Sequence, residues 1–232
     1  MNQAPTAVSG RSTRSRNAPP KVPIDLETPI HYIIQYPRTL APQTEVQGEL
    51  TIFCDGSRIP RDASGGAAIA YSIDGKWSGK IITIRRGISD ISVAEAAAIY
   101  EALKTAVELM PGKYRQLTIY SDSQQALHMI KRTRDLKGRA QSALTLEIFK
   151  LEQQLVKQGK EVTHSWVKGH HLSLGNRIAD NLAGRASQLS IQRRQARAVG
   201  QEVRRRQAEA GEEAARQQHQ APGRSDRGDS GD

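Results

Sequence analysis

Short apolar runs alternate with longer periodic segments through the middle of the chain. Two runs, residues 50–54 (LTIFC) and 117–121 (LTIYS), have the length and composition of buried strands, and residues 162–167 (VTHSWV) indicate a further strand. Two further strand-like runs, residues 65–73 and 76–87, are separated only by Asp74 and Gly75, a pair typical of a tight hairpin turn. The pattern therefore predicts five strands, the second and third of which form a hairpin.

Helical periodicity fills the segments between the later strands. A long helix is predicted in SVAEAAAIYEALKTAVELM, which stops before Pro111 and Gly112. Shorter helices are predicted in SQQALHMIKR, in RAQSALTLEIFKLEQQLVKQG and in GNRIADNLAGRAS. Strands followed by helix–strand alternation indicate one α/β domain of about 140 residues, with a sheet of mixed strand direction.

The chain divides into four parts. Residues 1–28 are expected to be a disordered basic arm, and residues 29–48, which contain the apolar stretch IHYIIQY, a lead-in segment. Residues 49–187 form the predicted domain. Residues 188–232 are rich in Arg and Gln and polar on every face, which leaves a helical extension and disorder both open. In this tail, residues 204–206 are three arginines, for which a nuclear signal, a phosphate anchor and solvated charge are the alternatives.

Composition narrows the class of protein. No run of about 18 apolar residues is present, which excludes a membrane-spanning helix. The first twenty residues lack the apolar stretch of a secretory signal, so an intracellular location is expected, with cytoplasm and nucleus not distinguished. The single cysteine, Cys54, excludes an internal disulfide framework and a cysteine-based zinc site.

The formal net charge of +10 favours an anionic partner, most commonly nucleic acid. Much of this charge lies in the tails, because residues 1–24 carry +4 and residues 188–232 carry +2. Charge alone therefore does not establish nucleic-acid binding. No obligate protein partner is indicated by the sequence.

Four acidic residues fall at predicted junctions between strands and helices: Asp55, Glu95, Asp122 and Asp180. A buried carboxylate is costly unless something neutralises its charge. Hard cations such as Mg²⁺ do so, since they prefer oxygen ligands. In α/β sheets these edges are also where ligands bind. The four acids together predict a metal site.

Each acid also has an ordinary structural explanation. Asp55 precedes Gly56, so the pair is an equally good candidate for a turn. Ser92 and Glu95 have the spacing of a capping box, which taken alone is the stronger explanation. Asp122 is a candidate N-cap, and Asp180, one turn into a helix, is favoured by the helix dipole.

Other residues near these junctions are candidates for chemistry or packing. Periodicity puts Glu95 on the apolar face of its helix, opposite a solvated face with Glu101. His170 and His171 lie in a loop, where a histidine is either a solvated residue or a proton carrier. Trp166 is expected to anchor the last strand by burial.

Four motifs together resemble ribonuclease H of type 1: CDGS, the AE pair that opens a helix, YSDSQQAL and WVKGHHLSLGNRIADNLA. The AE and SDSQ…AL forms look most like the domain of non-LTR retrotransposon reverse transcriptases. The resemblance covers residues 49–187. It implies a ribonuclease H-like fold, in which helices flank a five-stranded mixed sheet of three antiparallel strands followed by two parallel ones.

The resemblance also implies a function. The expected activity is hydrolysis of the RNA strand of RNA–DNA hybrids to 5′-phosphate and 3′-hydroxyl products. Asp55, Glu95, Asp122 and Asp180 would hold two Mg²⁺ ions, with Mn²⁺ as an alternative. His170 would shuttle a proton or aid product release. The residues expected to contact the hybrid are Gly56, Ser57, Ser92, Ser123, Gln124 and Asn176.

Several positions depart from the family pattern. Ser92 stands where cellular relatives often carry Asn, and Arg177 where many carry Glu. The basic segment with Lys131, Arg132, Arg134, Lys137 and Arg139 lacks an aromatic partner, which leaves phosphate contact and a solvated loop as equal alternatives. Two other functions remain open: a catalytically silent nucleic-acid-binding module, and a metal nuclease acting on DNA junctions.

Overall fold

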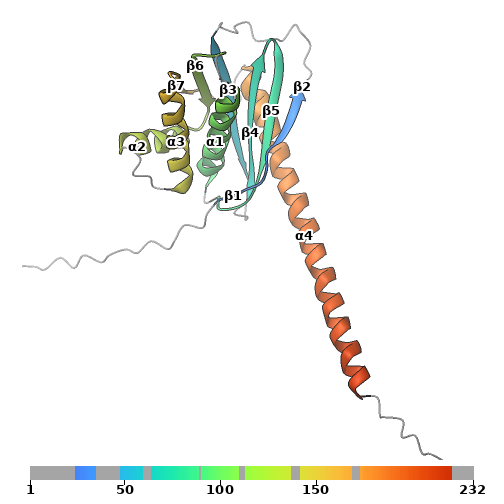
Figure 1. The fold of residues 1–232 in the computed structure, drawn as a ribbon. Helices are drawn as coiled ribbons and strands as arrows, with labels where there is room; N and C mark the ends of the chain where they lie inside the picture. Colours follow the sequence, from blue (N-terminus) through green and yellow to red (C-terminus); the bar gives the residue numbers. More distant parts are fainter. Residues whose placement is uncertain are drawn as a thin grey trace, which may run out of the picture.

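The computed structural model describes residues 24–34, 48–59, 64–88, 90–109, 113–136, 142–168 and 173–220. These residues form one mixed sheet with helices on both faces, and a long helix that runs out of the domain (Figure 1). Among them, no helix is long and apolar enough to cross a membrane.

The five expected strands are present, with the expected directions. β3 (Glu49–Arg58), β4 (Gly65–Ile73) and β5 (Lys76–Arg86) pair antiparallel in sequence order. β6 (Gln116–Ser121) pairs parallel with β3, and β7 (Glu161–Trp166) pairs parallel with β6. Asp74 and Gly75 both have positive φ, 52° and 72°, which a two-residue hairpin turn of this type requires. The mixed α/β fold class is therefore confirmed.

Two short strands extend this sheet beyond the five. β1 (Asp25–Leu26) and β2 (Ile30–Ile34) both pair antiparallel with β5, so the sheet has seven strands. They come from the segments assigned to the basic arm and the lead-in, and the boundary expected at residue 28 falls between them. Their role is to cover the outer edge of β5, which would otherwise present unpaired backbone groups.

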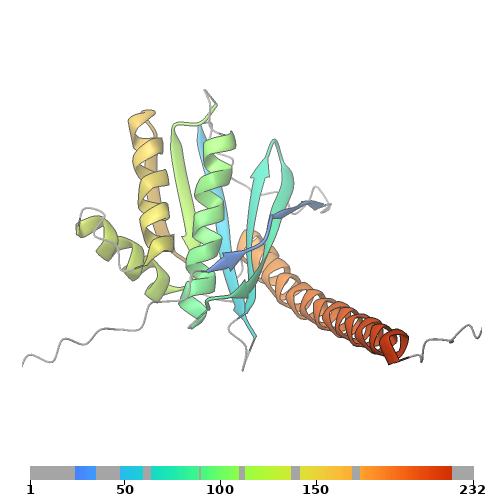
Figure 2. The ribbon, with the colours of Figure 1, turned by 60° about the horizontal axis from the view of Figure 1, so that its bottom comes forward.

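The helices cover both faces of the sheet. α1 (Ile91–Leu109), α2 (Gln124–Asp135) and α3 (Ala143–Lys157) pack on one face, and α4 (Leu174–Gln220) crosses the other (Figure 2). Alternate residues of β4 serve the two cores: Ile69 packs in the α1 core, whereas Ala68 and Ala70 pack against α4. Burial on both faces explains why β4 is apolar without alternation.

α4 is much longer than the helix expected at 175–187, because it continues to Gln220. Residues 188–220, for which extension and disorder were both open, are helical. Two hydroxyls fix the helix to the sheet: Ser187 Oγ donates to the Ser57 carbonyl and Ser190 Oγ to the Ile84 carbonyl, each at 3.2 Å. Beyond this anchorage the helix leaves the domain (Figure 1).

One helix face differs from the prediction. Glu101, expected on a solvated face of α1, is only 3% exposed. Lys80 of β5 lies 3.3 Å from its carboxylate, and Lys104 lies 3.6 Å away. The prediction was wrong because the Lys80 side chain reaches from β5 to Glu101 and supplies a cation, which allows a carboxylate to be buried.

Candidate active site

Asp55 and Asp122 are brought together by the register of two parallel strands. The last paired residues of β3 and β6 are Cys54 and Ser121, and each aspartate follows directly. Neighbouring strands lie about 4.8 Å apart, so the two carboxylates project side by side. β3 does not turn here, since it continues to Arg58 with Asp55 opposite Ala68 of β4. The alternative of an Asp–Gly turn is therefore excluded.

Glu95 comes from the first turns of α1. The helix is capped by Asp90, whose Oδ1 accepts a 2.8 Å hydrogen bond from the Ser92 backbone N–H and a second from the Ser92 hydroxyl. The capping box of Ser92 with Glu95 is thus wrong: the residue before the helix does the capping, and Glu95 is left to face the sheet. The Gly56 N–H and the Ser121 hydroxyl both hydrogen bond to its carboxylate.

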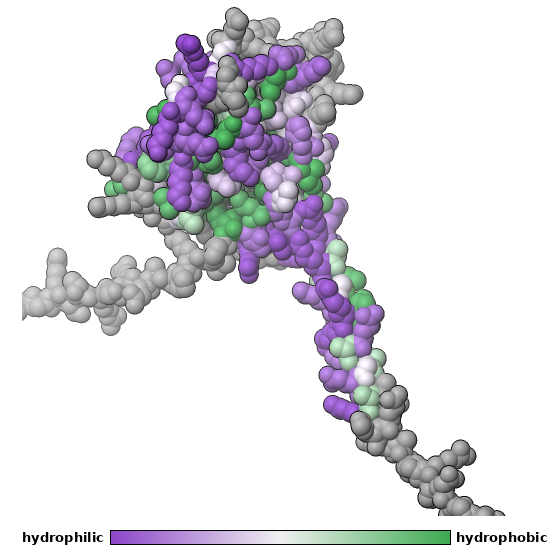
Figure 3. All heavy atoms as spheres, viewed as in Figure 1, coloured by the Kyte–Doolittle hydropathy of each residue, from purple (hydrophilic) through white to green (hydrophobic). Residues whose placement is uncertain are grey.

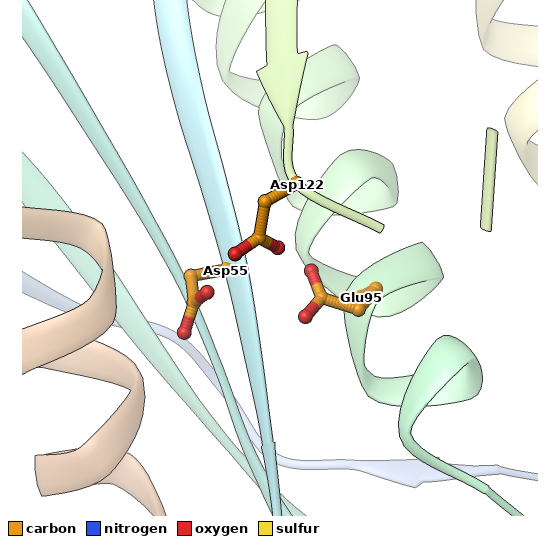
Figure 4. A group of neighbouring side chains, drawn as sticks. All are labelled: Asp55, Glu95 and Asp122. Atoms are coloured by element: carbon orange, nitrogen blue, oxygen red, sulfur yellow. The ribbon is translucent and has the colours of Figure 1, made fainter. Parts of the chain in front are cut away.

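The carboxylates of Asp55, Glu95 and Asp122 form one cluster (Figure 4). One oxygen from each residue lies within 4.8 Å of the others. Asp55 and Glu95 are buried, at 7% and 4% exposure, and Asp122 is part-buried. Three acids from β3, α1 and the end of β6 therefore share one small volume that is largely buried.

Their protonation reflects this crowding. Burial, together with the charges of Asp122 and Asp180, raises the pKa of Asp55 to about 8. Burial and the charges of Asp55 and Asp122 raise the pKa of Glu95 to about 9, against the opposing effect of its hydrogen bonds from Gly56 and Ser121. Without a cation, burial and mutual repulsion favour the protonated forms of Asp55 and Glu95.

Asp180 lies close to this cluster without belonging to the 4.8 Å group. It sits in α4 between Gly175, which packs against the Phe53 ring, and Ala186, which packs against Gly66. These two contacts hold this stretch of α4 against β3 and β4. The charge of Asp180 contributes to the raised pKa of Asp55, which places the fourth predicted acid at the edge of the site.

The residues present fit a divalent cation. All three clustered ligand atoms are carboxylate oxygens, the donors that Mg²⁺ and Mn²⁺ prefer. Glu95 Oε2 is buried and has no hydrogen-bond partner among the described residues. A buried acceptor of this kind is rare in proteins unless it serves a ligand or ion.

The residues predicted to contact substrate divide into two groups. Ser57, Gln124 and the backbone of Gly56 are part-exposed or exposed near the cluster. Ser123 is the N-cap of α2, where its Oγ accepts from the Ala126 N–H at 3.2 Å. The alternative of Asp122 as that cap is therefore wrong, because the helix begins one residue later.

Two predicted contacts are buried. Ser92 is fully buried and bonded to Asp90, so its side chain presents no atom to a substrate; it fixes the start of α1 instead. This corrects its assignment as a contact residue. Asn176 is 1% exposed, and its Oδ1 has no partner among the residues that the structure describes. His170 and His171 lie outside the described residues, so the role of His170 stays a prediction.

Trp166 was expected to be buried and is not. It is 49% exposed at the end of β7, and its indole Nε1–H donates to the Asp122 carbonyl at 3.0 Å. The sequence did not signal this contact, nor the hydrogen bond from Ser121 to Glu95, because both depend on which strands are neighbours. Trp166 and Ser121 thus each hydrogen bond to a member of the carboxylate cluster, Trp166 to the backbone of Asp122 and Ser121 to the side chain of Glu95.

Part of the basic segment is already paired. Arg134 donates twice to Glu152, at 2.8 and 3.2 Å, and His164 Nε2 lies 2.7 Å from the same carboxylate. Lys131 pairs with Asp135 at 2.8 Å. Arg134 therefore ties α2 to α3 rather than standing free for phosphate. Lys137 and Arg139 lie outside the described residues.

The sequence of the chain matches one known protein family. The sequence profile described as RNase H matches residues 47–188, more than half of the chain. The chain belongs to the RNase H family. Members of this family are nucleases of RNA–DNA hybrids that generally use divalent metals, and the carboxylate cluster is compatible with such an ion. No curated protein matches the chain.

Among solved structures, the chain is similar to the N-terminal RNase H domain of a Mycobacterium tuberculosis protein, solved as a fusion with maltose-binding protein. The two share 20% identity, the match covers 62% of this chain and 96% of that chain, and the TM-score is 0.46. The match to the RNase H profile ends at residue 188, so the rest of α4 lies outside it.

Proposed function

We propose that this RNase H chain hydrolyses the RNA strand of RNA–DNA hybrids, leaving 5′-phosphate and 3′-hydroxyl ends. The observation that carries the proposal is the cluster of Asp55, Glu95 and Asp122, with oxygens within 4.8 Å, in a chain of this family. A domain that only bound nucleic acid would have no physical reason to retain a cluster of mutually repelling acids near phosphate.

The four acids would hold two Mg²⁺ ions, with Mn²⁺ as the alternative. Asp55, Glu95 and Asp122 supply the inner oxygens, and Asp180 approaches from α4. When bound, the ions activate a water and neutralise charge on the leaving oxygen. The cation would also replace the protons that Asp55 and Glu95 otherwise take up at their raised pKa values.

The chain's own residues orient the reacting groups. Gly56 and Ser57 would approach the RNA strand, where the 2′-hydroxyl distinguishes RNA from DNA. Ser123, Gln124 and Asn176 would contact the hybrid, and His170 would carry a proton. Trp166 and Ser121 hold Asp122 and Glu95 through the hydrogen bonds described above. A hybrid substrate also fits an intracellular location, since such hybrids form inside cells.

The motifs further support a relationship to retrotransposon domains. The AE pair at Ala94 and Glu95 and the SDSQ segment at residues 121–124 are the forms found in RNase H domains of non-LTR reverse transcriptases.

The test is cleavage of an end-labelled hybrid with and without Mg²⁺. We expect metal-dependent cutting of the RNA strand, and loss of cutting by about a hundredfold or more in Asp55→Asn and in Asp122→Asn. Glu147→Gln, an exposed acid on α3, is the matched control and should cut like the wild type. A folded wild type that binds the hybrid but does not cut it would favour the silent module instead.

A further inference from the structure

Six large apolar side chains are exposed among the described residues, and one of them is hydrogen-bonded to a member of the carboxylate cluster. Single apolar residues of this kind are common on protein surfaces. Figure 3 shows apolar residues of α4 interspersed among hydrophilic ones. Five of the six lie on helices or at a helix end: Ile91, Leu136, Val156, Val199 and Val203. The sixth is Trp166, at the end of β7.

Trp166 is exposed because of its place on β7. Side chains alternate between the two faces of a strand, so Val162, His164 and Trp166 lie on one face. Val162 packs against the core that contains α1, and His164 Nε2 lies 2.7 Å from a carboxylate oxygen of Glu152 in α3. The helices thus cover the earlier residues of this face and leave Trp166, the last residue of the strand, 49% exposed.

One edge of the indole ring is held in place. Its Nε1–H donates to the Asp122 carbonyl at 3.0 Å. The backbone beside it is also held, because the Val167 N–H donates to the Ser121 carbonyl at 3.0 Å. The ring therefore has a set orientation next to the carboxylate cluster before any ligand binds, which reduces the entropy cost of a contact with a ligand.

An exposed cation follows Trp166 on the same side of the chain. Trp166 and Lys168 are exposed and Val167 between them is part-buried, which is the alternation of a strand that continues. At about 3.3 Å per residue, the two exposed side chains begin about 7 Å apart. Lys168 has no ion-pair partner in the part of the chain that the structure describes. An aromatic ring and a free ammonium group are thus presented side by side.

We infer that the ring of Trp166 packs against the ribose beside the scissile phosphate, and that Lys168 pairs with a neighbouring phosphate of the same RNA strand. The inference rests on the proposed function, which puts the scissile phosphate on cations held by Asp122 and the other acids. In a duplex the bases are stacked inside, so a ring that approaches from the side meets the sugar and phosphate. Proteins commonly hold nucleic-acid strands with aromatic rings beside positive charges.

Two variants separate the ring contact from the hydrogen bond to Asp122. Trp166→Phe keeps an aromatic face and removes the Nε1–H donor, whereas Trp166→Leu removes both. Binding of a fluorescently labelled hybrid is measured by anisotropy in EDTA, where metal binding plays no part. We expect Trp166→Phe to bind almost like the wild type and Trp166→Leu to bind about tenfold more weakly. Lys168→Gln should weaken binding several-fold and reduce the salt slope by about 1.

The two tryptophans of the chain provide a second measurement. Trp77 is 4% exposed, so acrylamide, which quenches fluorescence by collision, should reach mainly Trp166. Saturating hybrid should protect the emission of the wild type from acrylamide. In Trp166→Phe only Trp77 emits, and the hybrid should leave its quenching unchanged. Unprotected emission in the wild type at saturating hybrid would overturn the ribose contact.

Val156→Ala and Lys157→Gln are the matched controls. Both residues are exposed near the end of α3 that precedes β7, whereas the carboxylate cluster lies where β6 ends. Both variants should bind the hybrid like the wild type. Equal weakening in Lys157→Gln and Lys168→Gln would show a general charge effect and overturn the phosphate contact.

The outcome for the ring depends on the two Trp166 variants, each checked for folding by circular dichroism. Wild-type affinity in Trp166→Leu would overturn the ribose contact, as would an equal loss of affinity in Trp166→Phe. A wild type that binds the hybrid and protects Trp166, but does not cut in Mg²⁺, would overturn the proposed activity and leave this inference standing. A wild type that binds no hybrid would overturn both.

Discussion

Gly56 lies against the first turns of α1 so closely that a Cβ on it would be 2.4 Å from the Glu95 backbone nitrogen and 2.7 Å from the Ala94 carbonyl carbon. Real Cβ atoms do not approach backbone at such distances. Since Gly56 follows Asp55 directly, this contact sets the separation between two members of the carboxylate cluster.

We therefore expect Gly56→Ala to push α1 away from β3 and to separate Glu95 from Asp55. The variant should lose about 1 to 3 kcal/mol of unfolding free energy, as is usual for overpacking, and nearly all cleavage. Urea denaturation and the hybrid assay measure the two effects. Gly184→Ala is the control, because a Cβ there meets nothing within 4 Å and should stabilise the helix slightly. Normal activity in Gly56→Ala would contradict the packing argument.

The raised pKa values of Asp55 and Glu95 predict how the metal-free protein responds to pH. Because the folded pKa values, about 8 and about 9, exceed those of the unfolded chain, their contribution to stability is complete below about pH 4. It is lost as the pH rises through about 8 to 9. We expect the unfolding free energy of the metal-free protein to fall by several kcal/mol between these limits.

Thermal unfolding in EDTA from pH 5 to pH 9 measures this loss. Mg²⁺ should raise Tm most at high pH, where the carboxylates are charged. Asp55→Asn should flatten the pH dependence, whereas Glu147→Gln should leave it unchanged. A Tm that is flat with pH in the metal-free wild type would contradict the crowding of charge in this cluster.

Trp166 is predicted to position Asp122. Trp166→Phe keeps an aromatic ring but removes the 3.0 Å hydrogen bond to the Asp122 carbonyl, an interaction worth about 1 kcal/mol. We expect about three- to tenfold slower cleavage and weaker Mg²⁺ binding by calorimetry, with Tm almost unchanged because the side chain is half-exposed.

Trp77→Phe provides the comparison for this variant. Trp77 is 4% exposed, and its Nε1 has no partner among the described residues, so this change removes packing rather than a hydrogen bond. It should lower Tm and leave Mg²⁺ affinity intact. A lowered Tm with intact Mg²⁺ affinity in Trp166→Phe would show that Trp166 acts through packing alone.

Glu27 is predicted to hold the base of α4. Glu27→Gln leaves Arg193 and Arg197 without their acid and should cost about 1 to 2 kcal/mol at neutral pH. The lowered pKa fixes the sign: the contribution of Glu27 is present above about pH 4.5 and is lost as the pH falls through about 2.

Denaturation of wild type and variant at pH 7 and near pH 2 checks this. The difference in unfolding free energy between wild type and Glu27→Gln should be smaller near pH 2 than at pH 7. Asp25→Asn, which removes a more exposed partner of Arg85 and Arg86, should have a smaller effect. Equal stability of the Glu27→Gln variant and the wild type at pH 7 would contradict the anchor.

Local patterns determined a large part of this protein. The apolar runs of β3 and β6 and the hairpin at Asp74 and Gly75 could be placed from the sequence, because strand burial and positive φ each leave a mark on the residues concerned. The motifs around the four acids also identified the family, since they occur in one order at fixed spacing.

Only the tertiary structure decided how those residues are used. Asp55 proved to be inside a strand, Glu95 was released from capping by Asp90, and Glu101 was buried because Lys80 is beside it. Strand pairing and ion pairing between elements depend on residues far apart in the chain. The energies of these interactions come from burial and from strand register, which a local sequence pattern does not contain.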